Sequence, residues 1–199
     1  LVEIAYAEGN TSNEKSNSKV TKQEEHQGEQ EEIGRVYEIK EETWDVSKNQ
    51  DGSVIAKWTL NNRILTISGS GEMKDWTSSS KENWHSTQYT KTIEKVIIEN
   101  GITSIGMYTF SGCNSLTNIE IPSSVTSIGS HTFEYCRSLT NIEIPSSVTS
   151  IGSYAFEYCS SLTDIEIPNS VISIGGYAFY RCSSLREINV DSENQRYTS

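Results

Sequence analysis

The sequence is short of basic residues and histidines and has no long apolar run, and each shortage excludes a class of function. Its 199 residues include 16 Lys and Arg against 27 Asp and Glu, which gives a formal net charge of −11. A chain this acidic, without a basic stripe, is a poor candidate for binding nucleic acid or anionic lipid. No apolar run approaches the ~20 residues of a membrane-spanning helix, so we expect no membrane insertion in this segment.

The residue groups that usually carry catalysis or hold a metal are also missing. The three histidines, His26, His85 and His131, lie in different regions, so their spacing indicates neither a zinc site nor a catalytic dyad. Four glycines recur at a fixed interval, which favours a turn in every repeat over a phosphate-binding loop. They are Gly106, Gly129, Gly152 and Gly175. We therefore predict that the chain is not an enzyme and that it uses no cofactor and no metal.

The first 34 residues have little to bury. Residues 1–7 contain Ala5-Tyr6-Ala7, the small-x-small pattern of a signal-peptidase site, and they are either a signal-peptide remnant or an arbitrary apolar start. Residues 8–34 are rich in Glu, Gln, Asn, Ser and Lys and cannot offset the entropy of ordering their backbone. We predict that they form a disordered acidic linker.

A small β-rich N-terminal cap is predicted over residues 35–83. Two segments of alternating apolar residues, 54–60 and 63–69, flank Asn61 and Asn62, a pattern typical of a β-hairpin. The large apolar residues in and next to the cap include Trp44, Met73, Trp76 and Trp84. The tryptophans either bind sugar or pack the core of a unit that covers the first repeat. We favour packing, because repeat arrays need an atypical unit at the end.

The rest of the chain, residues 84–199, repeats itself every 23 residues. The copy at 132–153 reads TFEYCRSLTNIEIPSSVTSIGS, and its Phe, Cys and Leu positions recur without slippage. These columns are Phe110, Phe133, Phe156 and Phe179; Cys113, Cys136, Cys159 and Cys182; and Leu116, Leu139, Leu162 and Leu185. A period of roughly 20 to 29 residues that carries L-x-x-I-x-I is typical of leucine-rich repeats. We therefore predict a leucine-rich-repeat solenoid of about five 23-residue coils, the first and last irregular.

Each coil is expected to contribute a strand from its L-x-x-I-x-I segment, so that neighbouring coils build a parallel β-sheet. Pro122, Pro145 and Pro168 should end these strands, since proline cannot donate to the ladder. A second short extended run is expected at V-T-S-I-G, and one helical or 3-10 turn at T-F-E-Y-C. The cysteines hold one inward position, which favours buried free thiols over disulfides between adjacent coils, although export would permit oxidation.

Two outward-facing sets of columns are the candidate binding surfaces. On the strands, like charges in register would be relieved by a cation or a basic partner; alternatively, exposed Glu only keeps the sheet soluble. The strand residues are Thr117, Asn118, Glu120, Thr140, Asn141, Glu143, Thr163, Asp164 and Glu166. On the turns, tyrosines either offer contact area to a partner or cover the edge of the coil. The turn residues are Tyr135, Tyr154, Tyr158 and Tyr177.

The repeat sequence FEYCRSLTNIEIPSSVTSIGS resembles the BspA-like leucine-rich repeats of bacteria. The segment from Trp58 to Gly71 also resembles the sequence that often precedes such repeats in secreted Gram-positive proteins. The resemblance covers about residues 44–190. It implies a secreted or cell-surface protein whose repeats bind other molecules, often host or matrix proteins, and it implies no catalytic residues. Residues 187–194 are similar to a family variant that leads into further sequence, so we expect the natural chain to continue past Ser199.

The expected function is that of a secreted or cell-surface binding module that mediates protein–protein or adhesive contacts through its repeat faces. The partner is an unknown protein or glycan. Two alternatives stay open: a non-catalytic targeting arm of a larger secreted cell-wall enzyme, and a passive spacer in the envelope. The outward residues are nearly identical from coil to coil, which favours a periodic ligand or one bound with low specificity.

Overall fold

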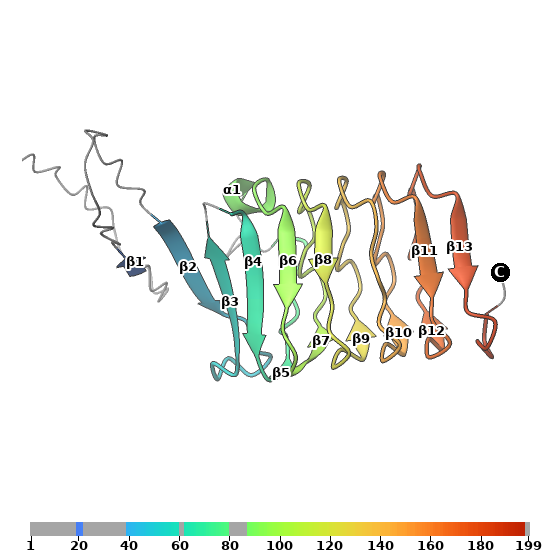
Figure 1. Cartoon of the computed structure of the whole chain (residues 1–199), viewed down its shortest axis with the longest axis horizontal. Coiled ribbons are helices and arrows are strands. Elements are labelled where there is room, and N and C mark those ends of the chain that lie inside the picture. Colours follow the sequence, from blue (N-terminus) through green and yellow to red (C-terminus); the bar gives the residue numbers. More distant parts are fainter. Residues whose placement is uncertain (1–18, 22–38, 60–61, 80–86, 198–199) are drawn as a thin grey trace, which may run out of the picture.

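The computed structural model describes residues 19–21, 39–59, 62–79 and 87–197. In Figure 1 the strands lie side by side in a row that follows the order of the chain, from β2 towards one end to β13 at the other. The described part contains almost no helix, since α1 (Thr87–Thr90) is a single turn. None of the described helical residues forms a segment with the length and apolar character needed to cross a membrane.

The largest sheet joins the cap to the first repeats. Its strands are, in spatial order, β1 (Lys19–Thr21), β2 (Ile39–Asp45), β3 (Val54–Thr59), β4 (Ile64–Gly69), β6 (Lys95–Ile98) and β8 (Asn118–Glu120). Strands β1 to β4 pair antiparallel, whereas β4 pairs parallel with β6 and β6 with β8. The predicted hairpin is therefore confirmed, and its second strand, β4, begins the parallel ladder of the repeats.

Two further sheets consist of parallel strands, all from the repeats except one strand of the five-stranded sheet, which belongs to the cap. The five-stranded one contains β5 (Gly71–Glu72), β7 (Ile102–Ile105), β9 (Ser127–Ile128), β10 (Ser150–Ile151) and β12 (Ser173–Ile174). The two-stranded one contains β11 (Asp164–Ile167) and β13 (Glu187–Val190). Ser127 pairs with Ser150, and Ser150 with Ser173, so partners are one sequence period apart. The predicted second extended run is confirmed in four successive repeats, as β7, β9, β10 and β12.

The repeats share one core built from columns of identical residues. We number them from their first core residue as repeat 1 (93–115), repeat 2 (116–138), repeat 3 (139–161), repeat 4 (162–184) and repeat 5 (185–199). Phe110, Phe133 and Phe156 are fully buried, and their ring centroids are 5.6 and 5.3 Å apart. Burying one such side chain contributes about 1.5–3 kcal/mol. Because each ring packs on its neighbours, a repeat depends on the adjacent repeats for its stability.

The cysteine column is a ladder of free thiols. All four cysteines are buried and none forms a disulfide. The thiol of Cys136 donates a hydrogen bond to the carbonyl oxygen of Phe110 at 3.2 Å, and that of Cys159 to Phe133 at 3.1 Å. The thiols of Cys136, Cys159 and Cys182 therefore each satisfy a carbonyl group of the preceding repeat.

Two expectations about the repeat backbone are wrong. Residues 139–144 of repeat 3 form no strand although their L-x-x-I-x-I pattern is intact. A strand needs hydrogen-bonded neighbours, and hollows lie on both sides of this segment, as described below. The T-F-E-Y-C segment forms turns and no helix, because alternate amide groups bond to the next repeat instead of within the segment. The N–H of Phe133 donates to Ala155 and that of Tyr135 to Glu157, both at 2.8 Å.

The recurrent glycines serve close packing, which corrects the expectation that they serve turns. The backbone φ of Gly152 is outside the left-handed region, and a Cβ at this position would lie 2.4 Å from the backbone nitrogen of Ser130 in the preceding repeat. Only glycine leaves room for this approach. The left-handed positions at the start of the turns are instead Tyr108, His131, Tyr154 and Tyr177, with φ of 56° to 59°.

Part of the prediction for residues 1–83 lies outside the described residues, and the disordered linker stays a prediction. Within it, Lys19–Thr21 pair with the open edge of β2 as β1. The other residues of 1–34, the boundary at residues 83 and 84, and Trp84 lie outside the described residues. Trp44 and Trp76 are only 7% and 3% exposed, which supports core packing over sugar binding.

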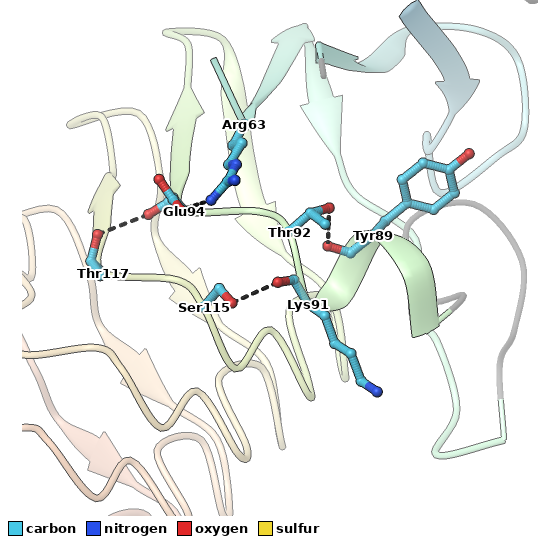
Figure 2. A network of polar contacts seen from close by, with 7 residues as sticks. All are labelled: Arg63, Tyr89, Lys91, Thr92, Glu94, Ser115 and Thr117. Atoms are coloured by element: carbon cyan, nitrogen blue, oxygen red, sulfur yellow. Dashed lines mark hydrogen bonds and ion pairs between the residues drawn. The ribbon is translucent and has the colours of Figure 1, made fainter. Parts of the chain in front are cut away.

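Polar contacts between side chains and carbonyl groups join the cap to the first two repeats (Figure 2). The guanidinium of Arg63 pairs with the carboxylate of Glu94. The hydroxyl of Ser115 donates to the carbonyl oxygen of Lys91 at 2.6 Å, and that of Thr117 to the carbonyl oxygen of Glu94 at 3.1 Å. Ser115 and Thr117, at the boundary between repeats 1 and 2, thereby satisfy carbonyl groups 24 and 23 residues earlier in the chain.

Candidate binding surfaces

The first candidate surface, which we call the strand face, is the outward side of the L-x-x-I-x-I segments in repeats 2 to 4. All nine predicted residues lie on it, and all are exposed except Thr163, which is half-buried. The threonine hydroxyls also hold the stack: Thr163 donates to the carbonyl oxygen of Thr140 at 3.4 Å, as Thr117 does to Glu94. The columns of Asn, Asp and Glu side chains are therefore the part of this face best placed to meet a partner.

The Glu column of the strand face is neutralised at one end only. The Lys95 ammonium of repeat 1 pairs with Glu120 at 2.5 Å. The residues that correspond to Lys95 in the following repeats are Asn118 and Asn141, which carry no charge to offset Glu143 and Glu166. Negative charge therefore accumulates from repeat 2 towards repeat 4.

Two hollows open on the strand face, one on each side of repeat 3. The first has a volume of about 580 Å³ and lies between residues 117–123 and 140–146. The second, about 540 Å³, extends from repeat 3 to repeat 5. Its carboxylates are Glu143, Asp164, Glu166 and Asp191. The interrupted strand ladder thus coincides with a recess whose lining is strongly acidic.

The second candidate surface, which we call the turn face, carries two stacks of rings. One stack consists of Tyr108, His131, Tyr154 and Tyr177, and the other of Tyr135 and Tyr158. Adjacent ring centroids are 4.4 to 5.1 Å apart, with ring planes within 16° of parallel. Each ring face inside a stack is covered by its neighbour, which supports the edge-covering role. Tyr177, at the end of its stack, is 64% exposed.

A group of side chains that could hold a metal lies on the turn face. Within the described residues, His131, Glu134 and Glu157 bring their ligand atoms within 4.8 Å of one another. Nδ1 of His131 lies 3.4 Å from a carboxylate oxygen of Glu134. Burial, and then the negative charge of Glu134, raise the pKa of Glu157. Burial and the same two carboxylates also raise the pKa of Tyr108.

The repeat sequence and the parallel sheets together agree with one known family. Residues 85–199 match the model of the BspA type leucine rich repeat region, in 6 copies. The chain belongs to this family. The match includes the residues of both candidate surfaces and contains one more copy than the five coils expected from the sequence.

Solved bacterial leucine-rich repeat proteins are similar to this BspA-type chain. One from Eubacterium ventriosum is 31% identical, with a TM-score of 0.60, over 78% of this chain and 45% of that one. The T. pallidum leucine-rich repeat protein is 26% identical, with a TM-score of 0.50, over 69% of each chain. A leucine rich cell surface protein from Faecalibacterium prausnitzii is 27% identical, with a TM-score of 0.50, over 72% of this chain and 42% of that one.

The chain spans less than half the length of the E. ventriosum and F. prausnitzii proteins. No curated protein is significantly similar to it.

The sequence predicted the two faces of this BspA-type chain but missed residues that the fold adds to them. Asp191 joins the acidic hollow from repeat 5, where the sequence departs from the I-P-S-S-V pattern. His131 meets Glu134 and Glu157, a group that a search for closely spaced histidines does not find. The signal was present in the repeat period, because Glu134 and Glu157 occupy the same position in successive repeats.

Proposed function

We propose that this chain is a solenoid of 23-residue coils that acts as a secreted or cell-surface binding module without catalytic activity. Its strand face binds an extended, basic segment of a partner protein. The family membership and the F. prausnitzii protein, which is described as a cell surface protein, support the location. The partner's chemistry rests on the structure of the strand face.

The acidic hollow between repeats 3 and 5 is the observation that carries this proposal. Four carboxylates line a recess of about 540 Å³. Glu120, the member of the Glu column that pairs with Lys95, lies outside this recess. Two carboxylates at the ~4.8 Å spacing of paired strands repel each other by roughly 1 kcal/mol even in a water-like dielectric, and Glu143 and Glu166 lie one repeat apart. A lysine or arginine of a partner would remove this repulsion and gain attraction from several carboxylates at once.

The periodic arrangement favours an extended partner. Residues of the Asn and Glu columns recur from repeat to repeat, so a chain that crosses the repeats meets the same groups at each step. The open strand ladder at repeat 3 leaves room for such a chain, since the hollows lie directly beside residues 140–144. Exposed charge pairs contribute little individually, so we expect weak, salt-dependent binding that grows with the number of basic residues.

The test is a binding titration with a fluorescein-labelled peptide of alternating lysine and serine, followed by fluorescence anisotropy. We expect the double variant Glu143→Gln/Glu166→Gln to raise the dissociation constant about 10-fold, because two exposed charge interactions contribute roughly 0.5–1 kcal/mol each. Glu99→Gln is the matched control, since Glu99 is an exposed carboxylate outside both hollows.

Equal affinities for the double variant and the wild-type chain would refute the strand face as the binding surface. Binding that does not weaken between 50 and 200 mM salt would contradict its electrostatic basis. Absence of any binding to basic peptides would instead favour the passive spacer.

A further inference from the structure

The ring stack that begins at Tyr108 departs from its own repeat at one place, and this departure brings a histidine next to two glutamates. The column of Tyr108, Tyr154 and Tyr177 has His131 in repeat 2. The column three residues later has Ser111 in repeat 1, Glu134 in repeat 2, Glu157 in repeat 3 and Tyr180 in repeat 4. A ring stack alone does not require the histidine, because tyrosine occupies the same left-handed position in the three other repeats.

The three side chains converge on one point. Nδ1 of His131 is 3.4 Å from a carboxylate oxygen of Glu134. Ligands about 2.0–2.1 Å from a tetrahedral metal ion are about 3.4 Å apart, so this distance fits two ligands of one ion. The carboxylate of Glu157 comes from the next repeat and completes a set whose ligand atoms all lie within 4.8 Å.

The imidazole of His131 has an unmet hydrogen-bonding requirement. Its Nδ1 is buried and makes no hydrogen bond to the described residues, because the contact with Glu134 lacks the geometry of one. Buried polar atoms without a partner are rare in folded proteins, and a bound ion can supply the missing interaction. The side chains of the three residues are half-buried, so the site is recessed and still reachable from solvent.

The local charges also favour a cation. Burial of Glu157 and the nearby negative charge of Glu134 both disfavour the ionised form of Glu157. The groups nearest to this pair include the phenol of Tyr108, the hydroxyl of Ser111 and the guanidinium of Arg181. Arg181 supplies one positive charge near Glu157, which leaves the pair only partly neutralised.

We propose that His131, Glu134 and Glu157 form a binding site for a divalent transition-metal ion of the zinc class. One imidazole nitrogen and two carboxylate oxygens are ligands that zinc accepts. Calcium prefers an all-oxygen set of six to eight ligands, which this site does not offer. Three protein ligands leave a coordination position for water or for a donor atom of a partner.

A bound metal would link repeat 2 to repeat 3 through side chains on the turn face. On the strand face, the strand ladder between these repeats is interrupted at residues 139–144. The metal would therefore stabilise the stack against local opening between these repeats. This site is separate from the acidic hollow, and its existence does not depend on the proposed function of the strand face.

The test uses the full, tag-free chain after treatment with a chelator. Zinc chloride is titrated by isothermal calorimetry, and thermal unfolding is followed with and without zinc. We expect one saturable site per chain and a melting temperature that rises by about 5 to 10 °C when zinc is in roughly 100-fold excess over its dissociation constant. Calcium chloride at the same concentration should leave the melting temperature unchanged.

His131→Tyr is the matched variant, because it removes the nitrogen ligand and restores the tyrosine that the other repeats have at this position. We expect it to fold with its ring stack intact and to lose the zinc-dependent shift. Glu157→Gln, which keeps the size of the side chain, should lose it as well, whereas Glu166→Gln on the strand face should retain it.

The proposal is overturned if the wild-type chain shows no saturable zinc binding. It is equally overturned if the His131→Tyr variant keeps the same shift, because the zinc would then be bound elsewhere, for example at His26 or His85. The metal-free variants should unfold at the melting temperature of the metal-free wild-type chain. A lost zinc-dependent shift then reports lost zinc binding rather than misfolding.

Discussion

Replacing Gly152 with alanine tests whether the close approach of neighbouring repeats stabilises the fold. The added Cβ would lie 2.4 Å from the backbone nitrogen of Ser130 and 2.6 Å from the carbonyl carbon of Gly129, whereas ordinary contacts begin at 3.4 Å. Both opposing atoms belong to the backbone, so no side-chain rotation relieves the clash. Repeats 2 and 3 must move apart by up to about 1 Å.

The expected cost follows from two opposing effects. Overpacking of a well-packed interior costs about 1–3 kcal/mol. Alanine also restricts the unfolded chain, which stabilises the folded state by about 0.4–1 kcal/mol. We therefore expect the free energy of unfolding to fall by about 1–1.5 kcal/mol. Gly176→Ala is the matched control, because a Cβ there meets no atom within 4 Å and the backbone φ is outside the left-handed region.

The assay is urea unfolding followed by circular dichroism, with the two variants and the wild-type chain compared at their midpoints. Gly176→Ala should unfold at the wild-type midpoint or slightly above it, and Gly152→Ala well below it. If the two variants agree within about 0.5 kcal/mol, the spacing of the coils is not fixed by these glycines and the explanation is wrong.

Two further predictions concern titrating groups. Burial raises the pKa of Cys113 to about 12 and that of Cys182 to about 11. At pH 8 the folded chain should therefore react slowly with iodoacetamide, and Cys182 should react first. Rapid labelling of Cys113 in the folded state would contradict its burial. Burial raises the pKa of Asp45, but hydrogen bonds from Ser47 and from the backbone N–H of Gly52 outweigh it and lower the pKa overall. The ionised form therefore stabilises the fold above the unfolded-state pKa of about 3.9, and this contribution is lost as the pH falls through the folded-state pKa. Asp45→Asn should lower the melting temperature at pH 7, and the difference should shrink below about pH 4; a difference independent of pH would exclude the charge as its cause.

The periodic sequence was sufficient to predict the core columns and the two outward faces. Residues one period apart must occupy equivalent positions in successive coils, so the inward or outward orientation of one copy applies to all. Phe110, Phe133 and Phe156 are buried and Glu120, Glu143 and Glu166 are exposed, as expected. Stacked tyrosines and free thiols follow from the same regularity.

Periodicity could not predict where neighbouring copies behave differently. Residues 139–144 have the same pattern as 116–121, yet only the latter contain a strand, because strand formation depends on the hydrogen bonds available from both neighbours. The short strand β1 depends likewise on the free edge that β2 presents.

The sequence by itself determined the repeat length, the family and the composition of each face, because all three are encoded by residues that recur every 23 positions. Only the tertiary structure decided why Gly152 must be glycine, since its reason is a backbone atom of another repeat. The same holds for His131, Glu134 and Glu157. Whether three such side chains come within 4.8 Å of one another depends on how closely two repeats pack and on which way each turn directs its residues.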